Sequence, residues 1–227
     1  KLIVTSHVSY LSGFRFDYRS LYEKVAQSDA LLLLDATQSL GVIPVDMNMA
    51  DFVVCSTYKW LLSVHGGGVL AVNPRRTGHL EPAYVGWRSV TDTPAGQDRF
   101  DTFEFQPDAR RFELGYPAYP TVYALERSAR LLLDVGIDNV ERHVSALGDM
   151  LIPMLASLGL EVMTPSDSRL RAGNFSFRHD DAESVAAKLQ ERGIYVMGGD
   201  GRVRVSVHAF NDSADIDALA AHLPACL

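Results

Sequence analysis

The sequence is poor in the residues that mark several large classes of protein. Lys and Arg number only 21 among 227 residues, against 28 Asp and Glu, so the formal net charge is −7. Contacts to phosphate backbones need clustered Lys and Arg, and no basic stripe is present, so we expect no nucleic-acid partner. The longest apolar stretches, such as residues 30–34, are far shorter than the roughly 20 residues of a membrane helix. We therefore expect no membrane partner.

Cysteine is almost absent and histidine is scattered. The two cysteines, Cys55 and Cys226, provide neither a disulfide framework nor a metal-ligand cluster. This fits a reducing compartment, and we expect a cytoplasmic protein. The seven histidines include no His-x-x-x-His pattern, so we expect no metal site.

What the sequence does contain is a series of short apolar runs separated by helical segments. Residues 30–34 are uninterrupted apolar residues followed by Asp35, residues 52–55 repeat the pattern, and residues 67–72 form a further run. Uninterrupted runs of this length are typical of strands buried on both faces of a parallel sheet. Their alternation with helical segments predicts an α/β fold with a mostly parallel sheet.

The pattern changes along the chain and predicts two domains. Residues 1–140 would be part of a large domain, and residues 141–227 would form a small α+β domain. Residues 77–111 show no sustained period and are expected to be a long functional loop. Helices are predicted over residues 20–27, 120–136, 139–158, 181–192 and 214–223. In the small domain, strands are predicted over residues 160–164, 174–178, 194–197 and 202–207.

Two of the predicted strands are followed by residues that could carry chemistry. Ligands of open α/β sheets bind at the carboxyl ends of the strands, where Asp35 and Lys59 are found. Taken singly, such an acid is most often a helix cap or turn residue, and such a lysine is most often on the surface. Taken together, they supply an amine for a Schiff base and a carboxylate for a pyridine nitrogen, both of which pyridoxal phosphate requires.

Five ordered motifs carry a resemblance to a known family. They are residues 6–13 (SHVSYLSG), 35–38 (DATQ), 56–59 (STYK), 111–115 (RFELG), and 204–211 (RVSVHAFN) followed by 215–217 (DID). In these motifs the sequence resembles the class V aminotransferase group of fold-type I pyridoxal-phosphate enzymes. That group includes cysteine desulfurases, kynureninases and isopenicillin-epimerase-like proteins. The resemblance runs along the whole chain, and several motifs in order are far more specific than any one of them.

The resemblance implies how the cofactor, pyridoxal 5'-phosphate, would be held. Lys59 would form the Schiff base and shuttle protons, and Asp35 would pair with the pyridine nitrogen. Gln38 matches the residue that reaches the ring oxygen. Ser56 and Tyr58 match positions that bind the phosphate, the Tyr being closer to the kynureninase pattern.

It also implies an amino-acid substrate and a homodimer with shared active sites. Arg204 matches the arginine that holds the substrate carboxylate, a task that suits a guanidinium because it donates two parallel hydrogen bonds. Gly115 and Tyr116 match the segment that approaches the phosphate of the neighbouring subunit. Trp87 resembles a kynureninase tryptophan of the active-site wall, with a buried core aromatic as an equal alternative.

The expected function is an enzyme, an aminotransferase in the first place. A carbon–sulfur lyase, a kynureninase-like hydrolase and an epimerase are the alternatives, since they share the same cofactor chemistry. Persulfide transfer is disfavoured because residues 193–204 contain no cysteine. The Gly-rich phosphate loop and the ring-stacking residue of the family cannot be assigned, so the chain resembles the C-terminal part of such an enzyme. A non-catalytic subunit that retains the fold is the remaining alternative. The Gly66–Gly68 run is expected to mark a close backbone approach.

Overall fold

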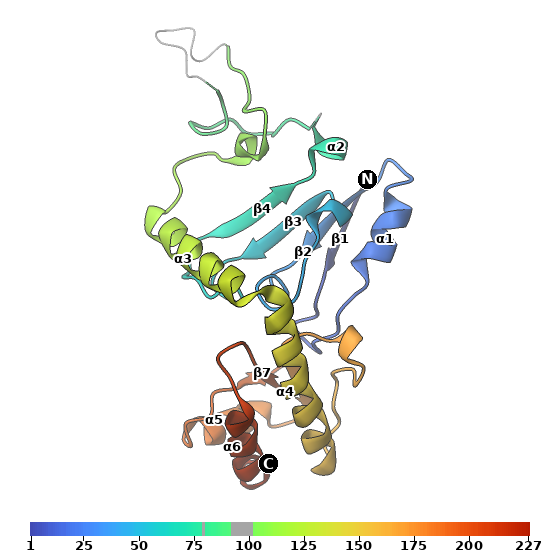
Figure 1. The fold of residues 1–227 in the computed structure, drawn as a ribbon, viewed down its shortest axis with the longest axis vertical. Helices are drawn as coiled ribbons and strands as arrows, with labels where there is room; N and C mark the ends of the chain where they lie inside the picture. The colour runs from blue at the N-terminus through green and yellow to red at the C-terminus, as the bar shows by residue number, and fades with distance from the viewer. Residues whose placement is uncertain (79, 92–101) are drawn as a thin grey trace. The chain divides into compact units, whose positions relative to one another are not determined.

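The computed structural model describes residues 1–78, 80–91 and 102–227 (Figure 1). The predicted loop over residues 77–111 lies partly outside these described residues. The chain forms two compact units. Unit 1 comprises residues 1–5, 18–37 and 46–130, and unit 2 comprises residues 6–17, 38–45 and 131–227. A domain boundary near residue 140 stays a prediction.

Unit 1 is built on a four-stranded sheet. Its strands are β1 (Leu2–Ser6), β2 (Leu31–Asp35), β3 (Phe52–Ser56) and β4 (Gly68–Val72), in that spatial order (Figure 1). β2 and β3 are parallel, and β4 is antiparallel to β3. Leu32 and Leu34 are fully buried on one face of β2, whereas Leu31 and Leu33 on the other face are only part-buried, so the expected burial of both faces is met on one face alone. The α/β fold class is thereby confirmed.

The first four helices agree with the sequence signals to different degrees. They are α1 (Tyr18–Val25), α2 (Pro74–Thr77), α3 (Tyr119–Val135) and α4 (Ile137–Ser157). α3 and α4 lie within two residues of their predicted bounds, α1 begins and ends two residues before them, and α2 was not predicted. Pro120 lies in the first turn of α3, where its missing N–H leaves no helical hydrogen bond unmade. Gly136, with φ of 84°, ends that helix in a conformation that favours glycine.

Unit 2 contains α4 and a three-stranded antiparallel sheet. Its remaining elements are β5 (Asn174–Arg178), α5 (Ala182–Gln190), β6 (Met197–Gly199), β7 (Arg202–Ser206) and α6 (Ser213–His222), with sheet order β5-β7-β6. Short 3-10 turns lie at Met47–Met49, Ala109–Phe112, Ser168–Leu170 and Leu223–Ala225. Phe175 and Phe177 of β5 and Leu151 and Leu155 of α4 are fully buried, and they form part of the core of this unit.

Two strand predictions in unit 2 were wrong. Residues 160–164 form only an isolated bridge between Val162 and Phe177. The amide of Ser176 binds the Thr164 hydroxyl at 2.8 Å, so a side chain replaces the main-chain partner that a ladder needs. β6 begins at Met197 and not at residue 194, because the Ile194 amide instead binds Leu189 O at the end of α5.

Among the described residues, no helix combines the length and the apolar character that crossing a membrane requires.

Candidate functional site

The carboxyl ends of β2 and β3 bring Asp35 and Ser56 to the same face of the sheet. In the parallel register Asp35 is the partner of Val54, and Ser56 lies two residues beyond Val54. Side chains two apart in a strand share a face, and so do register partners in neighbouring strands. Both side chains are part-exposed, whereas Cys55, between Val54 and Ser56, points to the buried face.

Thr37 ties the two strand ends together. Its amide donates to Asp35 Oδ1 at 2.8 Å, and its hydroxyl oxygen accepts the Ser56 amide at 3.2 Å. The first bond holds the carboxylate in one orientation and leaves its second oxygen without a hydrogen bond to any described residue. The strand of four leucines thus ends in a carboxylate that a neighbouring amide holds in place.

Lys59 lies in a loop that the buried side chain of Thr57 holds in place. Thr57 is fully buried, and its hydroxyl lies 3.0 Å from both Val64 O and Gly67 O. Lys59 itself is exposed, and no carboxylate in the described part of the chain pairs with its amine. The amine is therefore accessible from solvent.

The charges of Asp35 and Lys59 both affect the pKa of the Cys55 thiol. Burial raises the pKa of its thiol to about 12; the Asp35 charge adds to this rise and the Lys59 charge opposes it. Both charges therefore act on one buried thiol, so the strand-end acid and the loop lysine share one neighbourhood. A thiol with this pKa stays protonated and is a poor nucleophile at neutral pH.

Tyr58 and His65 form a pair that the sequence patterns did not reveal. Their rings stack with centroids 3.9 Å apart and planes inclined by 17°. The carbonyl of His65 accepts the Thr121 hydroxyl at 3.2 Å, which anchors the loop to the start of α3. The stack holds the phenol ring of Tyr58, for which the motif resemblance predicts phosphate binding, against the His65 ring. A lone histidine six residues after a lysine carries no pattern that would have identified it.

The glycine run in the same loop makes the expected close approach. A Cβ on Gly67 would lie 2.6 Å from Thr121 Cγ2 and 3.2 Å from Thr57 Oγ1. Gly66 has a φ of 95°, which side chains rarely adopt. The glycines therefore serve the packing of the Lys59 loop.

Arg204 and Gln38 belong to unit 2. Arg204 lies on β7, where its Nη1 donates to Tyr10 O at 3.4 Å, while its buried Nε has no partner among the described residues. Burial and the neighbouring Arg202 lower its pKa. No described carboxylate pairs with it, so the guanidinium is suited to bind an anion. Gln38 is buried and its Oε1 accepts Asn174 Nδ2 at 3.1 Å.

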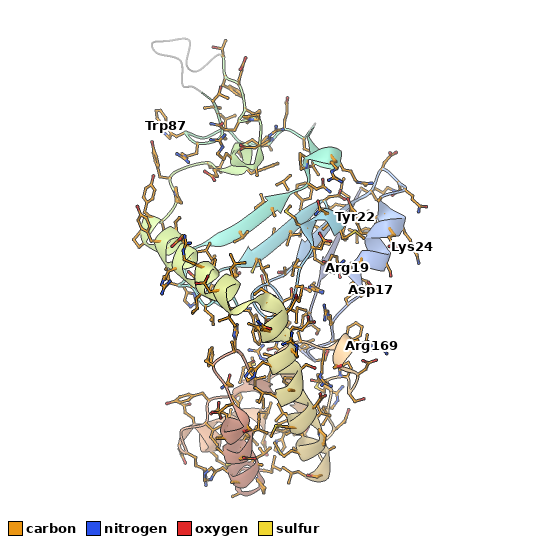
Figure 2. The ribbon with its side chains drawn as sticks, in the orientation of Figure 1. Asp17, Arg19, Tyr22, Lys24, Trp87 and Arg169 are labelled. Atoms are coloured by element: carbon orange, nitrogen blue, oxygen red, sulfur yellow. The ribbon has the colours of Figure 1, made fainter. Side chains whose placement is uncertain are left out.

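The remaining predicted residues lie on the surface of unit 1. Trp87 is 70% exposed (Figure 2), so it is not the buried core aromatic that was the alternative. Tyr116 is 72% exposed, and the Arg88 guanidinium lies 5.6 Å from its ring centroid. Nothing lies within 4 Å of a Cβ built on Gly115. This surface is open in the described chain.

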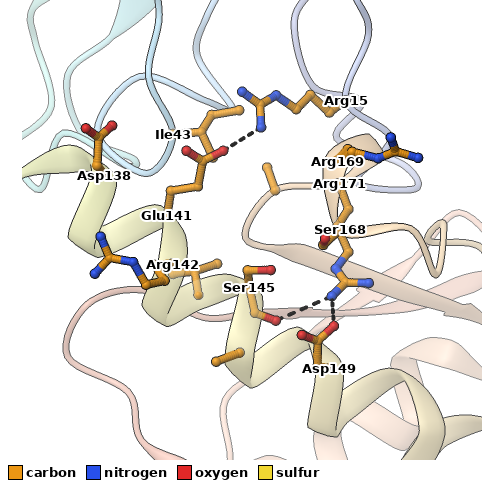
Figure 3. A pocket seen from close by; sticks show the side chains of 13 residues that line it. Arg15, Ile43, Asp138, Glu141, Arg142, Ser145, Asp149, Ser168, Arg169 and Arg171 are labelled. Carbon is orange, nitrogen blue, oxygen red and sulfur yellow. Dashed lines mark hydrogen bonds and ion pairs between the residues drawn. The ribbon is translucent and has the colours of Figure 1, made fainter.

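A separate cavity of about 710 Å³ lies in unit 2 along α4 (Figure 3). Two arginines of its lining pair with acids of the lining, Arg15 with Glu141 and Arg171 with Asp149. Asp138, Arg142 and Arg169 are its other charged side chains. It contains none of the predicted site residues. No group of metal-ligating side chains is found among the residues that the structure describes.

The fold agrees with that of known pyridoxal-phosphate proteins. A cysteine desulfurase from Thermococcus onnurineus superposes with a TM-score of 0.88 at 24% identity, over 99% of this chain and 59% of the other. A variant of the cystine C-S lyase C-DES, with glycine covalently linked to its PLP cofactor, gives 0.86 at 24% identity, over 99% and 60%. These likenesses identify the fold as that of the fold-type I PLP enzymes.

Comparison of the sequence with family models identifies the family. The model of the family "Aminotransferase class-V" matches residues 1–219, so the chain belongs to the class V aminotransferase family, which confirms the resemblance read from the motifs. The uncharacterized aminotransferase YcbU of Bacillus subtilis is 26% identical over 226 residues, which are 97% of this chain and 59% of the relative. The chain thus spans about three fifths of the length of this relative.

Proposed function

We propose that this chain is the cofactor-binding part of a pyridoxal-phosphate-dependent enzyme that acts on an amino acid. The proposed activity is that of an aminotransferase. The observation that carries the proposal is the gathering of Asp35, Ser56 and the unpaired amine of Lys59 at the carboxyl ends of two adjacent strands. Class V membership supports pyridoxal phosphate as the ligand of this arrangement.

The donor set fits this cofactor. The open oxygen of Asp35 would accept a hydrogen bond from a protonated pyridine nitrogen, while the Thr37 amide holds its other oxygen. The Ser56 and Tyr58 hydroxyls would bind the phosphate, and Gln38 would reach the ring oxygen. When bound, pyridoxal phosphate supplies an electron sink that stabilises negative charge at the substrate α-carbon.

In this proposal the chain's own residues hold the substrate and move its proton. Arg204, whose Nε has no partner among the described residues, would bind the substrate carboxylate in a two-pronged hydrogen bond. Lys59 would hold the cofactor covalently until the substrate amine displaces it. Its Nζ would then take the α-proton of the substrate and return it at a carbon other than the α-carbon. Asp35 would keep its negative charge throughout.

The proposed working unit is a cytoplasmic homodimer. Tyr116 and Trp87 are large, exposed side chains, as are Tyr84, Tyr119 and Tyr123 of the same unit. Aromatic side chains are enriched at protein interfaces, and an exposed group of them is typical of one. Gly115 and Tyr116 would then approach the phosphate bound by the partner subunit. Trp87 would line the active-site wall.

The alternatives differ only in the fate of the proton and of the substrate side chain. Lyase, hydrolase and epimerase chemistry use the same Lys59 and Asp35. Persulfide transfer is opposed by the two cysteines, because both Cys55 and Cys226 are buried. A non-catalytic subunit would leave the amine of Lys59 without a function.

The experiment is product analysis on a panel of amino acids, with and without a 2-oxo acid acceptor. The proposal predicts a new amino acid formed from the acceptor, in equal amount to the substrate consumed. Sulfide or pyruvate without an acceptor would indicate the lyase, and racemised substrate alone would contradict the aminotransferase assignment. An enzyme that consumes none of the panel but binds the cofactor would favour the non-catalytic alternative.

A further inference from the structure

The loop between β3 and β4 brings together two aromatic rings, one of which has no role in the site described so far. The rings of Tyr58 and His65 stack with centroids 3.9 Å apart and planes inclined by 17°. The Lys59 amine lies over the Tyr58 ring, 6.0 Å from its centroid. Tyr58 is 40% exposed, so core packing restrains it only in part. The stack therefore restricts a side chain that would otherwise change rotamer rapidly.

The backbone that carries His65 is fixed by residues other than Tyr58. The Thr121 hydroxyl donates to His65 O at 3.2 Å. On either side of His65, the carbonyl oxygens of Val64 and Gly67 both lie 3.0 Å from the hydroxyl of the buried Thr57. His65 thus provides a fixed base on which the tyrosine ring packs.

The turn between the two rings has a backbone conformation that a leucine rarely adopts. Leu62 has a φ of 56°, where a Cβ atom crowds the backbone. Its amide donates to Lys59 O at 3.0 Å, and the next amide, that of Ser63, donates to Thr57 O at 3.1 Å. These two hydrogen bonds close the turn and bring the second half of the loop back to the first. Strained conformations of this kind occur often at functional sites.

We propose that His65 is a positioning residue that holds the Tyr58 hydroxyl ready to bind the phosphate of the cofactor. This inference rests on the proposed function, in which Tyr58 is a phosphate ligand. Both residues, and Ser56 as the other proposed phosphate ligand, belong to unit 1. Restricting the ring before the phosphate binds reduces the entropy that binding would otherwise lose. His65 would thus strengthen phosphate binding without touching the phosphate.

The test is the substitution His65→Ala in the whole natural protein. The affinities for pyridoxal phosphate and for pyridoxal, which lacks the phosphate, are compared by absorbance titration. Loss of one aromatic stack should weaken the binding of pyridoxal phosphate about two- to tenfold. The affinity for pyridoxal should stay unchanged, because it has no phosphate for Tyr58 to bind. A general structural role of His65 would weaken the binding of both ligands equally.

Two further substitutions separate the ring of His65 from its nitrogen atoms. His65→Phe keeps a ring that can stack, and it should bind pyridoxal phosphate as tightly as the parent does. His65→Asn keeps a polar group near the position of Nδ1 but has no ring, and it should show the same loss as His65→Ala. The reverse result would mean that a histidine nitrogen binds the phosphate directly, and it would overturn the positioning role.

Tyr58→Phe provides a second check, because it removes the hydroxyl and keeps the stack. If His65 acts through that hydroxyl, adding His65→Ala to Tyr58→Phe should cause no further loss of affinity for pyridoxal phosphate. A further loss as large as that seen in the parent would show that His65 acts independently of the hydroxyl.

The outcomes distinguish this inference from the function on which it rests. His65 is exposed, so its variants should unfold near the temperature of the parent when free of cofactor. Should His65→Ala not fold, the comparison of His65→Phe with His65→Asn carries the same test. A folded His65→Ala protein with unchanged affinity for pyridoxal phosphate, or with equal losses for both ligands, would show that the positioning role is wrong. A parent that takes up no cofactor would overturn the proposed function itself.

Discussion

The Asp35 carboxylate shows how much of the site depends on one charge at a strand end. Its orientation is fixed by the Thr37 amide, and its charge is the part that a pyridine nitrogen would use. Asp35→Asn keeps the shape and removes the charge. A hydrogen bond to a charged group contributes about 1.5–3 kcal/mol, so we expect a loss of roughly 10- to 100-fold in the rate of substrate turnover.

The measurement is steady-state turnover on the best substrate of the panel. Asp29→Asn, which changes an exposed acid of the same unit, is the matched control and should leave turnover unchanged. Equal turnover by Asp35→Asn and the parent would show that the carboxylate does not serve the cofactor.

The two cysteines give a second prediction for single residues. Cys55 and Cys226 are 4% and 0% exposed, so both should resist alkylation in the folded protein at pH 8 and react after denaturation. Mass spectrometry of the labelled peptides measures this. Rapid labelling of either thiol in the folded chain would reopen persulfide chemistry.

The raised pKa of Cys55 also predicts how stability depends on pH. The folded-state pKa of about 12 lies above the ordinary value of 9.0, so the folded state favours the neutral thiol. This contribution is fully present below about pH 9 and is lost as the pH rises from 9 toward 12. Denaturant unfolding across that range should show a smaller loss of stability for Cys55→Ala than for the parent.

At the scale of elements, the loop from β3 to β4 is held by close packing against α3. Gly67→Ala would push a methyl group to 2.6 Å from Thr121 Cγ2, and overpacking of this kind costs about 1–3 kcal/mol. Chemical denaturation should show this loss. Gly68→Ala, whose nearest neighbour would lie at 3.5 Å, is the control and should be nearly neutral.

Thr121→Ala removes the obstructing methyl group and provides a rescue. The double variant should recover part of the stability lost by Gly67→Ala, measured relative to Thr121→Ala alone. An absence of any coupling between the two positions would contradict the close contact between the loop and the helix.

The elements that the sequence predicted well are those with strong local signals. β2 is marked by its leucine run, and α3 by Pro120 and Gly136. The two strand predictions failed where a side chain or a helix end made the hydrogen bond that a neighbouring strand would otherwise make. Thr164 does so for the Ser176 amide, and the end of α5 does so for Ile194. No local pattern predicts such long-range competition.

The same reasoning explains how much of the site could be predicted from the sequence. Asp35, Ser56 and Lys59 were found because strand ends are recognisable and their order matches a family motif. The Thr37 bridge, the stack of His65 on Tyr58 and the hydrogen bond from Asn174 to Gln38 depend on tertiary contacts between segments. Such contacts become visible only once the chain is folded.

At the scale of the whole molecule, the proposed dimer depends on the exposed aromatic surface of unit 1. Tyr116→Asp places a charge on that surface and should weaken association at least tenfold, since burying an unpaired charge is strongly unfavourable. Analytical ultracentrifugation measures the dissociation constant. Tyr195→Asp, at a 79% exposed tyrosine of unit 2, is the control. A Tyr116→Asp protein that associates as tightly as the parent would place the interface elsewhere.

The central claim is that Lys59 holds pyridoxal phosphate covalently. The direct measurement is reduction of the cofactor-loaded protein with borohydride, followed by peptide mapping of the labelled lysine. We predict a visible absorption band before reduction, a label on Lys59, and its loss in Lys59→Ala but not in Lys24→Ala, an exposed lysine of the same unit. A colourless protein, or a label on any other lysine, would contradict the account.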